Sequence, residues 1–188
     1  MAVDVSAEVR EAVAAAQAEL RAAAGRADVR WADVMQLHLT LQFLGNVPDE
    51  RVQDIVDAIA RASAGTGSLA LEARGLGGFP STRRPRVVWA GVGGDVARLA
   101  RLAASIGAAL GPCGYPAEAR AFHAHVTLGR VRSPRGLGRL VRGIEAAADE
   151  PLGAWTATEV VLYQSRLRPT GALYEAVARL PLRPASRT

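Results

Sequence analysis

Two of the three histidines open the same short pattern. His38 begins the segment HLTL and His125 begins HVTL, so each copy places a threonine two residues after a histidine. Imidazole titrates at about pH 6.5, which allows one histidine to accept a proton while the other donates one. Threonine hydroxyls donate hydrogen bonds to phosphate oxygens. Two such pairs in one cleft would suit acid–base hydrolysis of a phosphodiester without a metal.

We expect each copy to lie on a β-strand. Because strand side chains alternate between two faces, His38 shares a face with Thr40, and His125 shares one with Thr127. The intervening apolar residues then anchor the strands from the opposite face: Leu39, Leu41, Val126 and Leu128. If the two strands meet about a pseudo-twofold axis, the four polar side chains converge on one cleft.

Other interpretations of these residues exist. A histidine on a strand is more often structural than catalytic, and threonine is a common strand residue. His123 and His125 form the segment HAH, which could supply half of a zinc site. Only one further histidine and one cysteine are present, so a metal ranks behind acid–base chemistry. By alternation His123 lines the cleft with His125, or it makes a structural hydrogen bond.

The composition limits the class of protein. The chain has 188 residues, 49% of them hydrophobic, which suffices for a sizeable core. No apolar run approaches the ~20 residues of a membrane span, and no signal peptide is recognised. The lone Cys113 predicts a buried or idle thiol in a reducing compartment. We therefore expect a cytoplasmic protein, and we expect it to be a monomer.

The basic residues are unusual because all 23 are arginine, and they give a net charge of +5. Arginine presents a planar fork that suits phosphate, and a basic chain binds polyanions such as RNA. The alternative is a codon bias that replaces lysine by arginine throughout a genome. For the composition as a whole the bias is the stronger explanation, so each arginine needs its own argument.

Hydrophobic periodicity and turn residues predict the elements that must position the motifs. Both motif strands are followed by a proline-containing turn and a helix, and the histidines are 87 residues apart. Helices are expected over 6–24, 48–63, 95–110 and 133–148. Strands are expected over 1–5, 37–44, 85–92, 121–131, 157–167 and 173–182, together with a strand in 68–80 that runs into a glycine-rich loop.

The repeated strand–turn–helix unit predicts an α+β fold with two similar lobes. The boundary between the lobes is expected near residues 92–95, and the final strands, joined by a turn at 168–171, return to either sheet. We treat residues 1–182 as one bilobal domain and expect residues 183–188 to be a disordered tail.

Four segments together resemble a known family. LHLTLQFLGNV, FPSTRRPRVVWAGV, FHAHVTLGRV and LYQSRLRPTGALYEAVARLPL are similar to the RNA 2′,3′-cyclic phosphodiesterases, formerly called 2′-5′ RNA ligases. That family belongs to the two-histidine (LigT-like) phosphoesterases. The resemblance implies two pseudo-symmetric lobes with mainly antiparallel sheets around a central cleft. It also implies hydrolysis of a terminal RNA 2′,3′-cyclic phosphate to a 2′-phosphate, with no metal or cofactor.

The resemblance assigns roles to the motif residues. His38 would be the general acid that protonates the departing 3′ oxygen, and His125 the general base that activates water. Thr40 and Thr127 would hold the phosphate. The family usually opens with a longer apolar strand than MAVDV, so a shortened first strand is expected here.

Phe43 and Arg130 match two further family positions. Phe43 would stack on the base and Arg130 would bind phosphate. Both lie five residues after their histidine, and on an ideal strand an odd offset points to the opposite face. A bulge, a strong twist or a strand end must intervene for these roles to hold. Otherwise Phe43 belongs to the core and Arg130 is a surface charge.

Other functions fit the same motifs. The site could act on another cyclic phosphate, or join RNA ends by a 2′-5′ bond. A protein of another class, a non-catalytic RNA- or nucleotide-binding module, would use the cleft without needing two histidines as an acid–base pair.

Overall fold

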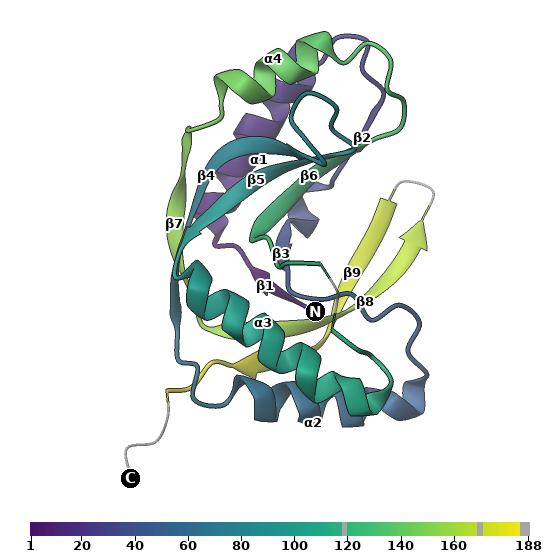
Figure 1. Ribbon diagram of the computed structural model, residues 1–188, viewed down its shortest axis with the longest axis vertical. Helices are drawn as coiled ribbons and strands as arrows, with labels where there is room; N and C mark the ends of the chain where they lie inside the picture. Colours follow the sequence, from purple (N-terminus) through teal and green to yellow (C-terminus); the bar gives the residue numbers. More distant parts are fainter. Residues whose placement is uncertain (118–119, 169–170, 185–188) are drawn as a thin grey trace.

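One curled antiparallel sheet runs through the whole molecule (Figure 1). The computed structural model describes residues 1–117, 120–168 and 171–184. Within them nine strands form the order β7-β4-β5-β6-β3-β1-β8-β9, and β2 pairs with β6. The bounds are β1 Ala2–Asp4, β2 Val29–Trp31, β3 His38–Thr40, β4 Leu69–Phe79, β5 Val87–Gly94, β6 His125–Val131, β7 Pro151–Ala157, β8 Glu159–Arg168 and β9 Gly171–Pro181.

Two helix pairs cover the sheet at opposite ends in Figure 1. Helix α1 (Ala7–Ala23) packs with α4 (Gly138–Ala146), and α2 (Val52–Ser63) packs with α3 (Val96–Leu110). Helix α1 begins where the Ser6 hydroxyl accepts a hydrogen bond from the Val9 amide, a typical N-cap. Within the described residues, no helix is both long and apolar enough to cross a membrane.

The α+β class and the antiparallel pairing are confirmed, but the lobes do not have separate sheets. Strand β3 pairs with β6 on one side and with β1 on the other, and these pairings join the strands of both lobes. Each helix pair takes one helix from each half of the chain. A single hydrophobic cluster therefore extends through the molecule, including the fully buried Leu39, Ile59, Leu128 and Ile144.

Several element predictions were wrong in detail. The glycine-rich part of 68–80 is strand, not loop, because Gly77 lies under the ring of Trp89, where an added Cβ would come within 2.2 Å of that ring. Strands β2 and β7 were not predicted. Strand β2 has only three residues and β7 is interrupted by Gly153, so neither shows a clear hydrophobic periodicity. Strand β3 is shorter than 37–44, β6 begins at His125 instead of residue 121, and α4 is shorter than 133–148.

Residues 183–184 pack against the turn after α2, so the expected disordered tail does not begin at residue 183. The carbonyl of Arg183 accepts a hydrogen bond from the Gly67 amide at 3.1 Å, and Pro184 bridges to Gly65 and Thr66. Residues 185–188 of the expected tail, and 169–170 of the expected turn, lie outside the described residues. Cys113 is a half-buried free thiol in a short 3-10 turn.

Candidate active site

The two His-x-Thr motifs lie on neighbouring antiparallel strands. Leu39 of β3 pairs with Val126 of β6, and both are fully buried. The same register places His38 across from Thr127 and Thr40 across from His125. Directly opposed residues on one face have Cβ atoms about 5 Å apart. The four polar side chains therefore form a compact square on one face of the sheet, with the apolar pair behind it.

Each histidine is fixed by the same hydrogen bond. The Nδ1–H of His38 donates to the carbonyl of Gln36 at 2.8 Å, and that of His125 donates to the carbonyl of His123 at 2.7 Å. Because a carbonyl oxygen only accepts, Nδ1 carries the proton in both rings. Nε2 is therefore the atom at which either imidazole gains or loses a proton.

Burial lowers the pKa of both motif histidines. For His38 the loss of hydration is the main cause, and the hydrogen bond to the Gln36 carbonyl opposes it. For His125 burial again comes first, the hydrogen bond to the His123 carbonyl opposes it, and the nearby Arg130 guanidinium lowers the pKa further. Near neutral pH the ligand-free site consequently favours two neutral imidazoles.

A β-bulge turns Arg130 toward the motif face. Val88 of β5 pairs with Gly129 of β6, but the next residue, Trp89, pairs with Thr127. Leu128 is therefore the extra residue, and the alternation of side chains shifts by one after it. Arg130 therefore lines the same cavity as Thr127, although it lies an odd number of residues, five, after His125.

The buried Gln17 of α1 holds this bulge. Its side-chain amide donates to the carbonyls of Leu128 and Ala32, both at 2.9 Å, and the Ala32 amide also donates to the Leu128 carbonyl. Gln17 is only 6% exposed, so these bonds satisfy a side chain that would otherwise be costly to bury. Sequence reasoning missed it because it lies 111 residues from Leu128.

Phe43 lies beyond the end of its strand and not in the core. Strand β3 stops at Thr40, after which Leu41 and Gln42 turn inward and are buried. Phe43 is 58% exposed and lines two adjoining cavities. The strand end thus places its ring beside the motifs, and the alternative of a core phenylalanine is wrong.

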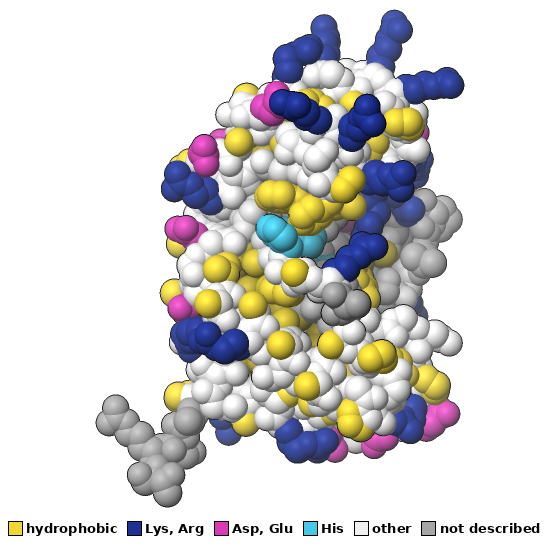
Figure 2. Space-filling view, viewed as in Figure 1, with side chains coloured by type: hydrophobic (Ala, Val, Ile, Leu, Met, Phe, Trp, Pro, Cys, Tyr) yellow, Lys and Arg dark blue, Asp and Glu magenta, His cyan; other side chains and the backbone are white. Residues whose placement is uncertain are grey.

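Two cavities meet at the motifs. The first has a volume of about 450 Å³ and includes His38, Thr40, Thr127, Arg130 and Arg30. The second, of about 640 Å³, shares His38 and Thr40 and extends toward the start of α2. Figure 2 shows histidine side chains at the hollowed middle of one face, with arginines above and beside them.

His125 and His123 lie against an aromatic wall. The ring of Phe79 packs edge-on against both histidines. Its centroid lies 5.1 Å from that of His125 and 5.4 Å from that of His123. The structure therefore places the His123 side chain against Phe79 and near Trp89, whose ring centroid lies 6.5 Å from that of His123. In the described part of the chain, no group of three or more histidine, cysteine or acidic residues could hold a metal ion.

Gln36 and Tyr174 hold the other side of His38, and neither role carries a signal in the sequence. The side-chain oxygen of Gln36 accepts the amide hydrogen of Tyr174 at 2.8 Å, while its backbone carbonyl holds the His38 ring. The ring of Tyr174 meets that of His38 edge-on at 4.7 Å. Gln36 thus connects the β8–β9 hairpin to the imidazole.

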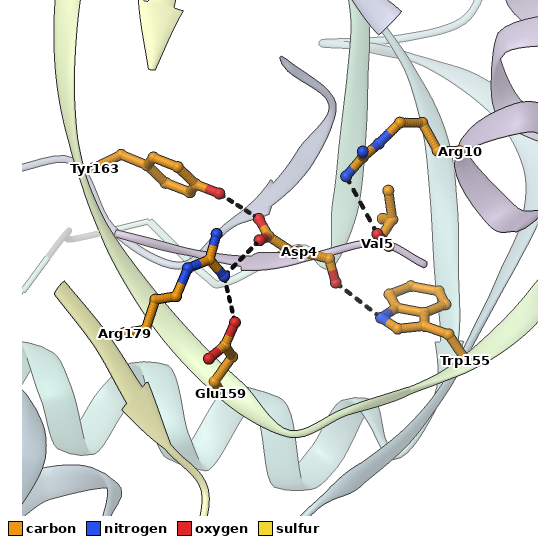
Figure 3. Close-up of polar contacts among 7 residues, drawn as sticks. All are labelled: Asp4, Val5, Arg10, Trp155, Glu159, Tyr163 and Arg179. Atoms are coloured by element: carbon orange, nitrogen blue, oxygen red, sulfur yellow. Dashed lines mark hydrogen bonds and ion pairs between the residues drawn. The ribbon is translucent and has the colours of Figure 1, made fainter. Parts of the chain in front are cut away.

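A polar network around Asp4 anchors β1 (Figure 3). Asp4 pairs with His38 in the sheet and accepts hydrogen bonds from Tyr163 at 2.5 Å and from Arg179 at 3.3 Å. Arg179 also pairs with Glu159. Burial, followed by the hydrogen bond to Asp4, raises the pKa of Tyr163 to about 12. Tyr163 is therefore a neutral hydrogen-bond donor, and its ring lies 5.7 Å from that of His38.

The fold and the doubled motif agree with the comparison to protein families. The family described as LigT like Phosphoesterase matches residues 3–89 and 94–174, which include both motifs. The chain belongs to this family.

Relatives match across most of the chain. A protein named RNA 2′,3′-cyclic phosphodiesterase from Aeropyrum pernix is 36% identical over 74% of this chain and 78% of its own length. One of the same name from Archaeoglobus fulgidus is 33% identical over 93% and 94%. The crystal structure of a Thermus thermophilus protein superposes with a TM-score of 0.79 at 27% identity, covering 99% and 97% of the two chains. The crystal structure of E. coli LigT complexed with 3′-AMP superposes with a TM-score of 0.73 at 27% identity, covering 96% of this chain and 95% of the E. coli chain.

Proposed function

We propose that this protein hydrolyses terminal RNA 2′,3′-cyclic phosphates to 2′-phosphates, with His38 and His125 as general acid and general base. The observation that carries the proposal is the pairing of β3 with β6, which places two fixed imidazoles and two hydroxyls on one face. The relatives named RNA 2′,3′-cyclic phosphodiesterase support the substrate class.

The phosphate would lie across the square of polar side chains. Thr40 and Thr127 donate hydrogen bonds to its two non-bridging oxygens from adjacent strands. Arg130, turned inward by the bulge, adds a charge-assisted contact. The nucleotide 3′-AMP in the related E. coli structure also carries a phosphate on its ribose. These contacts orient phosphorus between the two Nε2 atoms.

The two histidines then divide the proton transfers. Water attacks phosphorus while Nε2 of His125 takes its proton, and the P–O3′ bond breaks as Nε2–H of protonated His38 donates to the departing 3′ oxygen. The product has a 2′-phosphate and a free 3′-hydroxyl. Exchange with solvent returns the proton from His125 and recharges His38. Which histidine is the acid follows from the family resemblance.

The substrate itself helps to set the required protonation state. Burial lowers the pKa of both histidines in the ligand-free site. A bound anionic phosphate favours the protonated form of a nearby imidazole and so raises its pKa. One proton is therefore taken up as the substrate binds, which creates the acid–base pair only when it is needed.

An assay with defined RNA ends tests the proposal. RNA bearing a 2′,3′-cyclic phosphate is incubated with the purified protein in the presence of EDTA, and the product is separated from 2′- and 3′-phosphate standards. We expect a 2′-phosphate, and we expect His38→Asn and His125→Asn each to lower kcat by at least about 100-fold, within the range of general acid–base catalysis. The proposal is refuted if no 2′-phosphate forms, or if either variant retains full activity with a native fold.

A further inference from the structure

The positive charge of this protein is concentrated in two short segments. Residues 26–30 and 130–142 contain seven of the 23 arginines but one of the 18 acidic residues, a net charge of +6. The remaining 16 arginines and 17 acidic residues nearly cancel. A codon bias alone would spread arginine along the chain, so this concentration needs a local reason.

The two segments meet at the edge of the active site. Arg30 of β2 lies directly opposite Arg130 of β6, and both are exposed and line the 450 Å³ cavity. Like charges directly opposed on one sheet face repel each other and destabilise the pair. A bound anion between or above them removes that repulsion. Asp33 also lines this cavity, but one of its oxygens accepts the Met35 amide.

The basic surface continues from this pair toward α4. Gly25 and Gly136 bring the two segments together: a Cβ on Gly25 would lie 3.0 Å from the side chain of Arg139, and one on Gly136 would lie 3.3 Å from the Arg26 carbonyl. Arg26 and Arg139 are both exposed. We call Arg130, Arg30, Arg26 and Arg139 the arginine strip. Arg132 is left out because the register places it across from Asp28.

The strip has no carboxylate partners within the part of the chain that the structure describes. The ion pairs found there involve Arg51, Arg98, Arg166 and Arg179 instead. Figure 2 shows arginine side chains gathered over the end of the molecule that carries α4 and beside the hollow. These guanidinium groups are thus available to an external polyanion that also reaches the cavity.

The second cavity has the opposite character. No arginine lines it among the described residues, the acidic Asp49 does, and much of its wall is apolar, including Leu44, Val52 and Ile55. An anionic chain that ends at the motifs is therefore favoured on the side of the strip and disfavoured on the side of α2.

We propose that the arginine strip binds the phosphodiester backbone of the RNA upstream of its reacting end. The inference rests on the proposed function, because it takes the terminal phosphate to lie at the two motifs. The strip contacts phosphates and not base edges, so it raises the affinity for longer RNA without reading its sequence. The protein is thereby selective for RNA ends over cyclic mononucleotides.

Salt dependence of binding tests this directly. A hexanucleotide ending in a 2′-phosphate and a mononucleotide 2′-phosphate are titrated into the full-length protein between about 50 and 200 mM KCl. Each arginine–phosphate contact contributes about 0.7 to the slope of log affinity against log salt for a single strand. The double variant R26Q/R139Q should lower the hexanucleotide slope by about 1.4, which corresponds to about sevenfold less salt-induced loss of affinity over this range.

A matched variant controls for overall charge. R61Q/R101Q removes two exposed arginines from α2 and α3, and it should leave the hexanucleotide slope at the wild-type value. Equal slopes for the two ligands in the wild type, or an equal effect of both double variants, would overturn the proposal. The proposal would also be overturned if R26Q/R139Q lost binding to anionic lipid vesicles but bound the hexanucleotide as the wild type does.

This experiment separates the two proposals. It measures binding of product-ended RNA and requires no turnover. If cyclic-ended RNA is hydrolysed but R26Q/R139Q keeps the wild-type slope, the strip is wrong and the proposed function stands. If the slope falls as expected but no cyclic phosphate is hydrolysed, the proposed function is wrong and the strip still binds RNA.

Discussion

Replacing Gln17 tests whether the bulge at Leu128 aims Arg130. Gln17→Met keeps the length of a buried side chain but removes the amide that donates to the Leu128 and Ala32 carbonyls. Each hydrogen bond contributes about 0.5–1.5 kcal/mol, so the free energy of unfolding should fall by about 1–3 kcal/mol. Urea denaturation measures this loss.

The same change should weaken phosphate binding at a distance. Gln17 does not line either cavity, so its effect on the site must pass through the bulge. A charge-assisted hydrogen bond contributes about 1.5–3 kcal/mol, which sets the upper limit on what misdirecting Arg130 could cost. We expect part of this, roughly a three- to tenfold higher Kd for a mononucleotide 2′-phosphate in isothermal titration calorimetry.

A double-mutant cycle shows whether Arg130 transmits the effect. In an Arg130→Gln background, Gln17→Met should still cost stability but raise Kd no further, because the side chain that the bulge directs is gone. Gln53→Met on the exposed face of α2 is the matched control and should change neither quantity. The reasoning is refuted if Gln17→Met destabilises the protein without changing Kd, or raises Kd by the same factor in both backgrounds.

The other predictions concern separate parts of the site. Gln36→Leu removes the acceptor of the Tyr174 amide hydrogen and should lower kcat about two- to tenfold with little change in KM. Gln36→Glu keeps an acceptor and should have a kcat close to that of the wild type. An unchanged kcat in Gln36→Leu would contradict this prediction. Phe43→Ala should raise KM several-fold but lower the free energy of unfolding by no more than about 0.5 kcal/mol, because the side chain is 58% exposed; a large loss in urea denaturation would instead indicate a core role. Burial lowers the pKa of both histidines in the free enzyme, and a bound phosphate opposes this shift. The pH profile of kcat, which reports the enzyme–substrate complex, should therefore lose activity at a higher pH than the profile of kcat/KM, which reports the free enzyme. If the two profiles lose activity at the same pH, the substrate does not raise the pKa of the acid. Gly77→Ala would place a Cβ 2.2 Å from the Trp89 ring and should cost about 1–3 kcal/mol by urea denaturation, whereas Gly111→Ala, which meets no atom within 4 Å, should cost less.

The sequence predicted the elements whose signals are local. A period of 3.6 marked the four helices, and the doubled His-x-Thr alternation marked the cores of β3 and β6. It failed where the signal is weak or distributed. Strand β2 has three residues, and the close packing of Gly77 in β4 depends on the Trp89 ring of the neighbouring strand.

In the candidate site too, the residues with a local sequence pattern were predicted, and those that depend on long-range contacts were not. His38, Thr40, His125 and Thr127 were evident because their types and spacing recur, and the need for a bulge or strand end at Arg130 and Phe43 followed from the odd offset. Gln17, Gln36 and Tyr174 carry no such pattern. Gln36 meets Tyr174 across 138 residues of chain, and a single sequence does not indicate that contact.

By itself, therefore, the sequence determined which side chains could move a proton or hold a phosphate, because side-chain chemistry and strand alternation are local properties. Only the tertiary structure decided that the two motifs are neighbours. The pairing of Leu39 with Val126 joins residues 87 positions apart, and the extra residue Leu128 turns Arg130 to their face. Long-range pairing and packing against α1 fix both features, since backbone hydrogen bonds and buried polar groups must find partners wherever the chain brings them together.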